Sequence, residues 1–177
     1  GETDIAFKLL TQTSYPGWGY MLEKGATTMW ERWEQATGKG MNSHNHAMYA
    51  SIGSWFYKYL AGIKLPDSCV GFSDIVVEPI FPTSLDWVKV ELDTIKGKIS
   101  VSWVKQSTSL LLKICIPMGS NCDLRLPIFD NDFDAIEESG VSLAKVPKSR
   151  IQDVQNIDNK ITINIEGGNY DFDIKHK

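Results

Sequence analysis

The stretch WVKVELDTIKGKISVSWV, residues 87–104, holds two segments in which apolar and polar side chains alternate with a period of two. This alternation is typical of strands that bury one face and expose the other. Lys96 and Gly97 lie between the two segments and predict a tight turn. We therefore expect residues 87–104 to form a β-hairpin.

After Pro66 the sequence changes to this period-two pattern, in short segments before and after the hairpin. Further strands are predicted at residues 75–79, 110–116, 122–126, 160–165 and 170–174. Turns are expected at residues 118–121 and 166–169, where glycine and asparagine gather. About seven short strands in roughly 105 residues are typical of an antiparallel β-sandwich.

The first part of the chain follows a helical pattern instead. Residues 3–10 are expected to be helical, with Thr3 or Asp4 as the N-cap. A helix is predicted over residues 45–63, because apolar side chains recur there every three to four residues. Between them lies an aromatic loop rich in glycine. We predict an α+β fold with a helical domain at residues 1–68 and a β-sandwich domain at residues 69–177.

Composition excludes several functional classes. The 177 residues carry 18 Lys+Arg against 22 Asp+Glu, and the basic residues are scattered, so nucleic acid is not an expected partner. No apolar stretch approaches the roughly 18 residues of a membrane span. Residues 1–4 show no features of a secretory leader, and the sequence does not indicate a compartment. Phosphate-binding and dinucleotide motifs are absent from the sequence, so no cofactor is expected.

Neither the cysteines nor the acidic stretch predicts a metal site. Cys69, Cys115 and Cys122 form no C-x-x-C pair, so buried thiols are favoured, although a Cys115–Cys122 bridge across a turn stays open. Residues 129–140 are rich in carboxylates but lack the glycine and terminal glutamate of a calcium loop. We interpret this stretch as a solvated loop.

The aromatic loop contains the candidates for chemistry. Glu31 lies between Trp30 and Trp33, where desolvation raises a carboxyl pKa while Arg32 opposes the rise. Indole faces beside a carboxylate also suit a sugar ligand. The residues alone leave open a structural salt bridge or a core position for Glu31.

Two histidines follow in the segment before the predicted helix. His44 and His46 are two residues apart, a spacing that does not place both rings on one helical face, and no ligand set is near in sequence. Zinc is therefore not expected, and one histidine is interpreted as a hydrogen-bond donor. Ser43 or Asn45 is expected to cap the helix.

Residues 15–33, YPGWGYMLEKGATTMWERW, followed by residues 41–46, MNSHNH, resemble the end of the catalytic domain of bacterial α-L-rhamnosidases. The resemblance continues through residues 54–63 and 75–79, and less closely to residues 168–172. It implies the last helices of an (α/α)6 toroid followed by a C-terminal β-sandwich. It also implies inverting hydrolysis of terminal α-L-rhamnosides, with rhamnose-containing glycosides as substrates.

The same resemblance assigns roles to particular residues. Glu31 matches the family's general base, His46 matches a sugar-contacting histidine, and Trp18, Trp30 and Trp33 would wall the pocket. The family's general acid lies upstream of this segment, so the chain is expected to be the C-terminal piece of a rhamnosidase and inactive alone. The alternative is a carbohydrate-binding or structural β-sandwich with a helical extension. Residues 5–10 and 48–63 are expected to expose apolar faces through which the chain would form a homo-oligomer.

Overall fold

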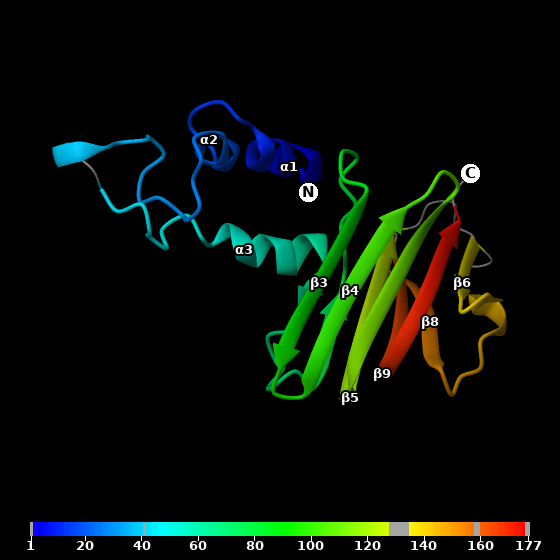
Figure 1. Cartoon of the computed structure of the whole chain (residues 1–177). Helices are drawn as coiled ribbons and strands as arrows, with labels where there is room; N and C mark the ends of the chain where they lie inside the picture. The colour runs from blue at the N-terminus through cyan, green and yellow to red at the C-terminus, as the bar shows by residue number, and fades with distance from the viewer. Residues whose placement is uncertain (1, 41, 128–134, 158–159, 176–177) are drawn as a thin grey trace. The chain divides into compact units, whose positions relative to one another are not determined.

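The structure of the chain is a computed structural model that describes residues 2–40, 42–127, 135–157 and 160–175 (Figure 1). The chain divides into two compact units. The helical unit comprises Gly1–Phe56 and Pro82–Ser84, and the β unit comprises Tyr57–Phe81 and Leu85–Lys177. No helix in these described ranges is long and apolar enough to cross a membrane.

The helical unit begins with the expected helix, α1 (Thr3–Thr11). Neither predicted residue caps it, because Glu2 occupies the N-cap position and makes no side-chain capping bond. Asp4 instead accepts hydrogen bonds from the backbone N–H and the hydroxyl of Thr83, each at 3.0 Å. The unit continues with α2 (Trp18–Glu23), a 3₁₀ turn η1 (Gly38–Gly40) and α3 (Ile52–Trp55).

The long helix predicted over residues 45–63 is wrong in its extent. Helix α3 starts at Ile52 and continues as a π-helix, η2 (Phe56–Leu60). Residues 43–46 hydrogen-bond to an earlier segment of the chain, and Ile63–Lys64 form strand β1 against strand β2 (Asp74–Val77). Tertiary pairing at both ends therefore overrides the local helical pattern.

The β unit forms one mixed sheet around two long strands, β5 (Ser109–Pro127) and β9 (Lys160–Lys175) (Figure 1). These strands pair antiparallel over nearly their whole length. β4 and β2 flank β5, while β6 and β8 flank β9. The other elements are β3 (Trp87–Thr94), β4 (Gly97–Lys105), β6 (Ile136–Glu138), β7 (Val141–Ser142), the 3₁₀ turn η4 (Leu143–Lys145) and β8 (Ile151–Ile157).

The hairpin predicted at residues 87–104 is confirmed, since β3 and β4 pair in register with Thr94 opposite Gly97. The turn between them is formed by Ile95 and Lys96, one residue earlier than predicted. The expectation of a wholly antiparallel arrangement is wrong, because β2 runs parallel to the second half of β5 and aligns Val77 with Leu124. Parallel neighbours need a long crossover connection. The β3–β4 hairpin lies within that crossover, an arrangement that local patterning cannot predict.

Two predicted turns are irregularities inside the long strands. β5 and β9 each continue through them, and their register shifts between Ile116 and Asn121. Gly167 lies opposite, where a Cβ atom would come within 2.6 Å of the Pro117 carbonyl oxygen. A bulge therefore replaces the predicted turns, and glycine is needed there for close approach rather than for chain reversal.

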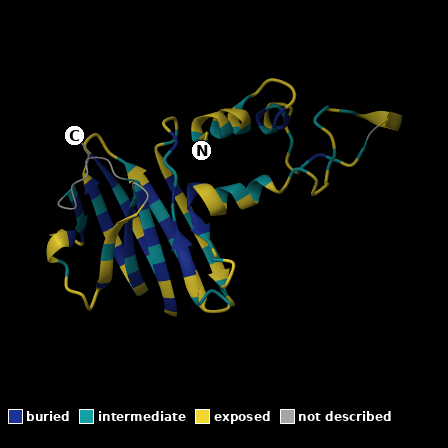
Figure 2. Ribbon diagram, turned by 180° about the vertical axis from the view of Figure 1, so that it is seen from behind, coloured by how far each residue is buried: buried dark blue, intermediate teal, exposed yellow. Residues whose placement is uncertain are grey.

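Side chains on one face of each strand build the core of the β unit, as the alternating burial in Figure 2 shows. Trp103 is fully buried, and its indole N–H donates to the Leu60 carbonyl oxygen at 2.9 Å. The ring of Phe81 meets it edge-to-face at 5.2 Å between centroids. This partner satisfies the one polar atom of a large core side chain.

The cysteines and the acidic stretch have clear positions. All three cysteines are free thiols, so no Cys115–Cys122 bridge forms. The expectation of buried thiols holds only for Cys122, whose pKa is raised by burial, because Cys69 and Cys115 are half-buried. Residues 129–134 of the stretch predicted as a solvated loop lie outside the described residues, whereas residues 136–138 are strand β6. Glu138 is buried, and the Arg150 guanidinium donates to its two oxygens at 2.5 and 2.6 Å.

We expect Gly62→Ala to destabilise the chain by more than about 2 kcal/mol. Gly62 has φ +74°, and an added Cβ would lie 2.1 Å from the Glu78 carbonyl carbon. Gly140→Ala is the matched control, because Gly140 has φ +79° but open space around its Cβ position. Urea unfolding followed by circular dichroism should show a larger loss for Gly62→Ala, and equal losses would contradict the steric argument.

A second prediction concerns acid stability. Burial alone would raise the pKa of Glu78, but its salt bridges to Lys160 and Lys64 outweigh that effect and lower the pKa to about 2. A depressed carboxyl pKa stabilises the fold above the unfolded value of 4.5 and loses this contribution as the pH falls through the folded value. We expect at most about 3 kcal/mol of stability to be lost between pH 4.5 and 2.

Unfolding curves of wild type and Glu78→Gln measure this contribution. The variant should be less stable at neutral pH and should lose less stability than wild type on acidification. The same pH dependence in both proteins would show that Glu78 is not responsible.

Candidate functional site

Two stretches of the helical unit run side by side and carry the predicted site. We call residues 28–31 and 42–46 the paired segment. The Glu31 N–H donates to the Ser43 carbonyl oxygen at 2.9 Å, and the His46 N–H donates to the Met29 carbonyl oxygen at 2.8 Å. The Thr28 hydroxyl adds a bond to the His44 carbonyl oxygen. These bonds bring Glu31 and His46, fifteen positions apart in the sequence, onto adjacent parts of one small framework.

The carboxylate of Glu31 is bound by residues from the other stretch of the paired segment. The Ser43 N–H donates to Glu31 Oε2 at 2.9 Å. This bond is the main cause that lowers the pKa of Glu31; the Asn42 side chain and the charges of His46 and Arg32 act in the same direction. Glu31 is therefore a carboxylate at neutral pH, which is the form a general base needs.

The predicted rise in the pKa of Glu31 is therefore wrong, because the flanking rings have other partners. Trp30 is only 4% exposed and stacks on His44 with 4.8 Å between ring centroids. Trp33 stacks on Tyr49 at 3.9 Å. Hydrogen bonds to Glu31 outweigh the desolvation that the sequence alone emphasised.

His46 is exposed and has a defined acceptor atom. The Met48 N–H donates to His46 Nδ1 at 3.0 Å, so a neutral ring carries its proton on Nε2. The ring can thus donate a hydrogen bond outward. Ser43 does not cap the predicted helix; its hydroxyl accepts the Asn45 N–H at 3.0 Å within the paired segment.

The three tryptophans fall into two groups. Trp18 and Trp33 meet edge-to-face at 5.1 Å, and the Trp18 indole N–H donates to the Tyr49 carbonyl oxygen at 3.2 Å. Trp30 instead lines a narrow cleft together with Asn42 and His44. The helical pattern of the sequence hid the contribution of Tyr49.

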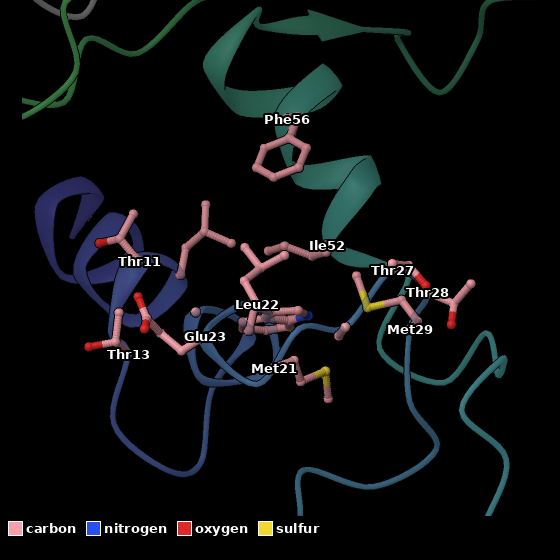
Figure 3. A pocket seen from close by; sticks show the side chains of 14 residues that line it. Thr11, Thr13, Met21, Leu22, Glu23, Thr27, Thr28, Met29, Ile52 and Phe56 are labelled. Carbon is pink, nitrogen blue, oxygen red and sulfur yellow. The ribbon is translucent and has the colours of Figure 1, made fainter. Parts of the chain in front are cut away.

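Trp18 also lines an apolar pocket of about 690 Å³ in the helical unit. Figure 3 shows Leu22 on α2 and Ile52 and Phe56 on the later helix pointing into the space between them. Glu31, His46 and the other two tryptophans are not among its lining residues. The pocket therefore borders the paired segment at Thr28 and Met29 but does not include the candidate catalytic and sugar-binding residues Glu31 and His46.

No group of three or more potential metal-binding side chains occurs in the part of the chain that the structure describes. The functional groups of the site are one ionised carboxylate, one imidazole that can donate a hydrogen bond from Nε2, and a group of aromatic rings. Carboxylates and aromatic faces in this combination suit polyhydroxylated ligands.

Comparison with known proteins agrees with this inventory. Residues 1–60 match the six-hairpin glycosidase domain of bacterial α-L-rhamnosidases, and residues 62–140 match the C-terminal domain of the same enzymes. The chain belongs to the bacterial α-L-rhamnosidase family. All five predicted site residues lie within the part that matches the glycosidase domain.

Individual α-L-rhamnosidases resemble the chain along its whole length. The enzyme from Formosa agariphila is 30% identical over 99% of the chain, which covers 19% of that protein. The structure of the enzyme from Dictyoglumus thermophilum matches 99% of the chain with 33% identity and a TM-score of 0.85. That of the Streptomyces avermitilis enzyme complexed with L-rhamnose matches 99% with 27% identity and a TM-score of 0.82.

The chain matches only a small share of each relative, although nearly all of the chain is matched. The chain spans 19% of the Dictyoglumus thermophilum enzyme and 16% of the Streptomyces avermitilis enzyme. It thus corresponds to about a fifth of an α-L-rhamnosidase and includes the paired segment.

We expect Tyr49→Ala to destabilise the helical unit by about 1 kcal/mol or more, because Trp33 loses its stacking partner. The backbone carbonyl that binds the Trp18 indole remains in the variant. Near-ultraviolet circular dichroism should lose intensity, whereas Tyr57→Ala at an exposed position should leave the spectrum of the tryptophans almost unchanged. An unaltered spectrum in Tyr49→Ala would contradict the stacking.

Proposed function

We propose that the chain is the C-terminal part of an inverting α-L-rhamnosidase, an enzyme that removes terminal α-L-rhamnose from rhamnosides. The observation that carries the proposal is the paired segment. It places an ionised Glu31 and an outward-donating His46 side by side, within residues that match the glycosidase domain.

In this proposal Glu31 is the general base. Its carboxylate takes a proton from the water that attacks the anomeric carbon, and a low pKa keeps it ionised before the reaction. His46 Nε2–H donates to a hydroxyl of the sugar. Trp18, Trp30 and Trp33 supply aromatic walls of the sugar pocket.

An inverting enzyme also needs a general acid, with the two carboxyl groups roughly 6.5–9.5 Å apart. We place that acid in the portion of the relatives, about four-fifths of their length, that the chain does not cover. Loss of general acid catalysis alone removes a factor of roughly 10² to 10⁴ in rate. The chain by itself is therefore expected to be inactive.

The proposed domain division is residues 1–68, completing an (α/α)6 toroid, and residues 69–177, forming a β-sandwich. Strands β5 and β9 run through both halves of the sheet and support a sandwich. The bulge at their middle bends the strands, which allows one half of the sheet to fold over the other half. The exposed apolar side chains Ile5, Leu9 and Met48 support contact with further helices or with a second copy.

A second candidate is a carbohydrate-binding module with a helical extension. Trp87 on β3 favours it, because this indole is 63% exposed at the edge of the sheet and offers a flat face for a sugar ring.

The test is release of chromophore from p-nitrophenyl α-L-rhamnoside and binding of L-rhamnose followed by two-dimensional NMR. We expect no release from wild type or Glu31→Gln. L-rhamnose should shift the signals of His46 and the paired segment, and D-glucose should not.

Other outcomes separate the alternatives. Activity that disappears in Glu31→Gln would show that the site is complete and the missing-acid argument is wrong. Shifts confined to Trp87 would favour the binding module. Absence of any shift with L-rhamnose would contradict the proposed sugar site.

A further inference from the structure

Ser43 is the residue at which the second stretch of the paired segment binds Glu31. Its carbonyl oxygen accepts the Glu31 N–H at 2.9 Å, and its own N–H donates to Glu31 Oε2 at 2.9 Å. Two residues directly opposite in an antiparallel pair normally exchange both bonds through their main chains. Here the Glu31 carboxylate takes the place of a main-chain acceptor. Ser43 therefore holds Glu31 both at its main chain and at the far end of its side chain.

The hydroxyl of Ser43 shapes the chain that follows it. Ser43 Oγ accepts the Asn45 N–H at 3.0 Å, which is the hydrogen bond of a serine turn between residues two positions apart. One residue later, the His46 N–H donates to the Met29 carbonyl oxygen at 2.8 Å. The turn thus lies between two attachments to the first stretch, and it sets the course of the main chain from Ser43 to His46.

Three bonds from three different atoms fix the orientation of Ser43. Both of its main-chain bonds lead to Glu31, and two contacts still allow rotation about the line that joins them. The bond from Asn45 to Oγ lies off that line and removes this freedom. A glutamate side chain has three rotatable bonds, so its carboxylate is placed only as well as the donor that meets it.

We propose that Ser43 is a positioning residue for the catalytic base: its hydroxyl fixes the turn at residues 43–45 and thereby holds the Ser43 N–H on the Glu31 carboxylate. The same turn places His46. This inference rests on the proposed function, in which Glu31 is the base and His46 contacts the sugar. Ser43 acts through these two residues, and one turn keeps the carboxylate and the imidazole in a constant arrangement for the reaction.

Other contacts keep the second stretch in place without orienting the carboxylate. The Thr28 hydroxyl donates to the His44 carbonyl oxygen, and the His44 ring stacks on Trp30 with 4.8 Å between centroids. Neither contact involves an atom of the Glu31 side chain. Both remain when the Ser43 hydroxyl is removed, so we expect the paired segment to survive that change.

The first experiment uses the wild-type chain. An NMR pH titration follows the Glu31 carboxyl carbon together with the backbone amide signals of Ser43 and Gln12. The Ser43 amide should move with the midpoint of Glu31, because protonation removes the charged acceptor of its N–H. The Gln12 amide donates to the Lys8 carbonyl oxygen at 3.0 Å at the end of α1 and should not follow Glu31.

The second experiment compares three variants. Ser43→Ala removes the hydroxyl, Ser43→Thr keeps one on the same carbon, and Ser54→Ala changes an exposed serine of α3. In Ser43→Ala the Asn45 amide should exchange with water about five-fold faster, as expected for the loss of one ordinary hydrogen bond. The Glu31 midpoint should rise toward its ordinary value of 4.5. Ser43→Thr and Ser54→Ala should keep both quantities close to those of wild type.

Three results would overturn the inference. One is a wild-type Ser43 amide signal that ignores the ionisation of Glu31. Another is an unchanged Glu31 midpoint in Ser43→Ala while the amide signals of Glu31 and His46 show an intact paired segment. The third is Ser43→Thr that behaves like Ser43→Ala. Loss of the paired segment in Ser43→Ala and its retention in Ser43→Thr would support the inference, because the two variants differ in the hydroxyl.

These readouts separate Ser43 from the other influences on Glu31. The charges of Arg32 and His46 also act on this carboxylate, and both residues are present in wild type and in every variant. None of the readouts depends on sugar binding. Failure of L-rhamnose to bind would therefore count against the proposed function and not against the contacts of Ser43.

Discussion

The antiparallel ladder between β5 and β9 is the constraint on which the rest of the β unit depends. It aligns Ser109 with Lys175 at one end and Pro127 with Lys160 at the other. All remaining strands in the described ranges attach to one of these two, directly or through one neighbour. Because every further strand takes its register from this ladder, the bulge at its centre decides which side chains reach the core in each half of the sheet.

The helical unit depends on a much smaller interaction. Its site is organised by a few backbone hydrogen bonds between residues 28–31 and 42–46, and these bonds align functional groups from both stretches. The same geometry settles the electrostatics of Glu31. Donors from the opposite stretch stabilise the charged form more than desolvation by the neighbouring indoles opposes it. In the proposed function, Glu31 would therefore be ionised before a substrate arrives.

The apolar surface of the helical unit fits its place in a larger protein. Ile5 and Leu9 are each more than half exposed on α1, and a pocket lined by Leu22, Ile52 and Phe56 lies beside it. Surfaces of this kind in a folded unit mark contacts with further protein. Together with the coverage of about a fifth of each relative, they support a proposal in which the acid, the remaining helices and a complete sugar pocket come from elsewhere in the enzyme.

The sequence by itself determined the strands of the hairpin at residues 87–104, helix α1 and the family, because these follow from local periodicity and from a contiguous motif around Glu31. The tertiary structure decided the parallel pairing of β2 with β5 and the shorter extent of the helix predicted at residues 45–63, which starts only at Ile52. It also decided the direction of the pKa shift of Glu31. Each of these depends on partners distant in sequence, and hydrogen bonds between such partners override local propensity. Local patterning contains no information on which distant donor a carboxylate will meet, so the hydrogen bond from the Ser43 N–H to Glu31 emerged only from the fold.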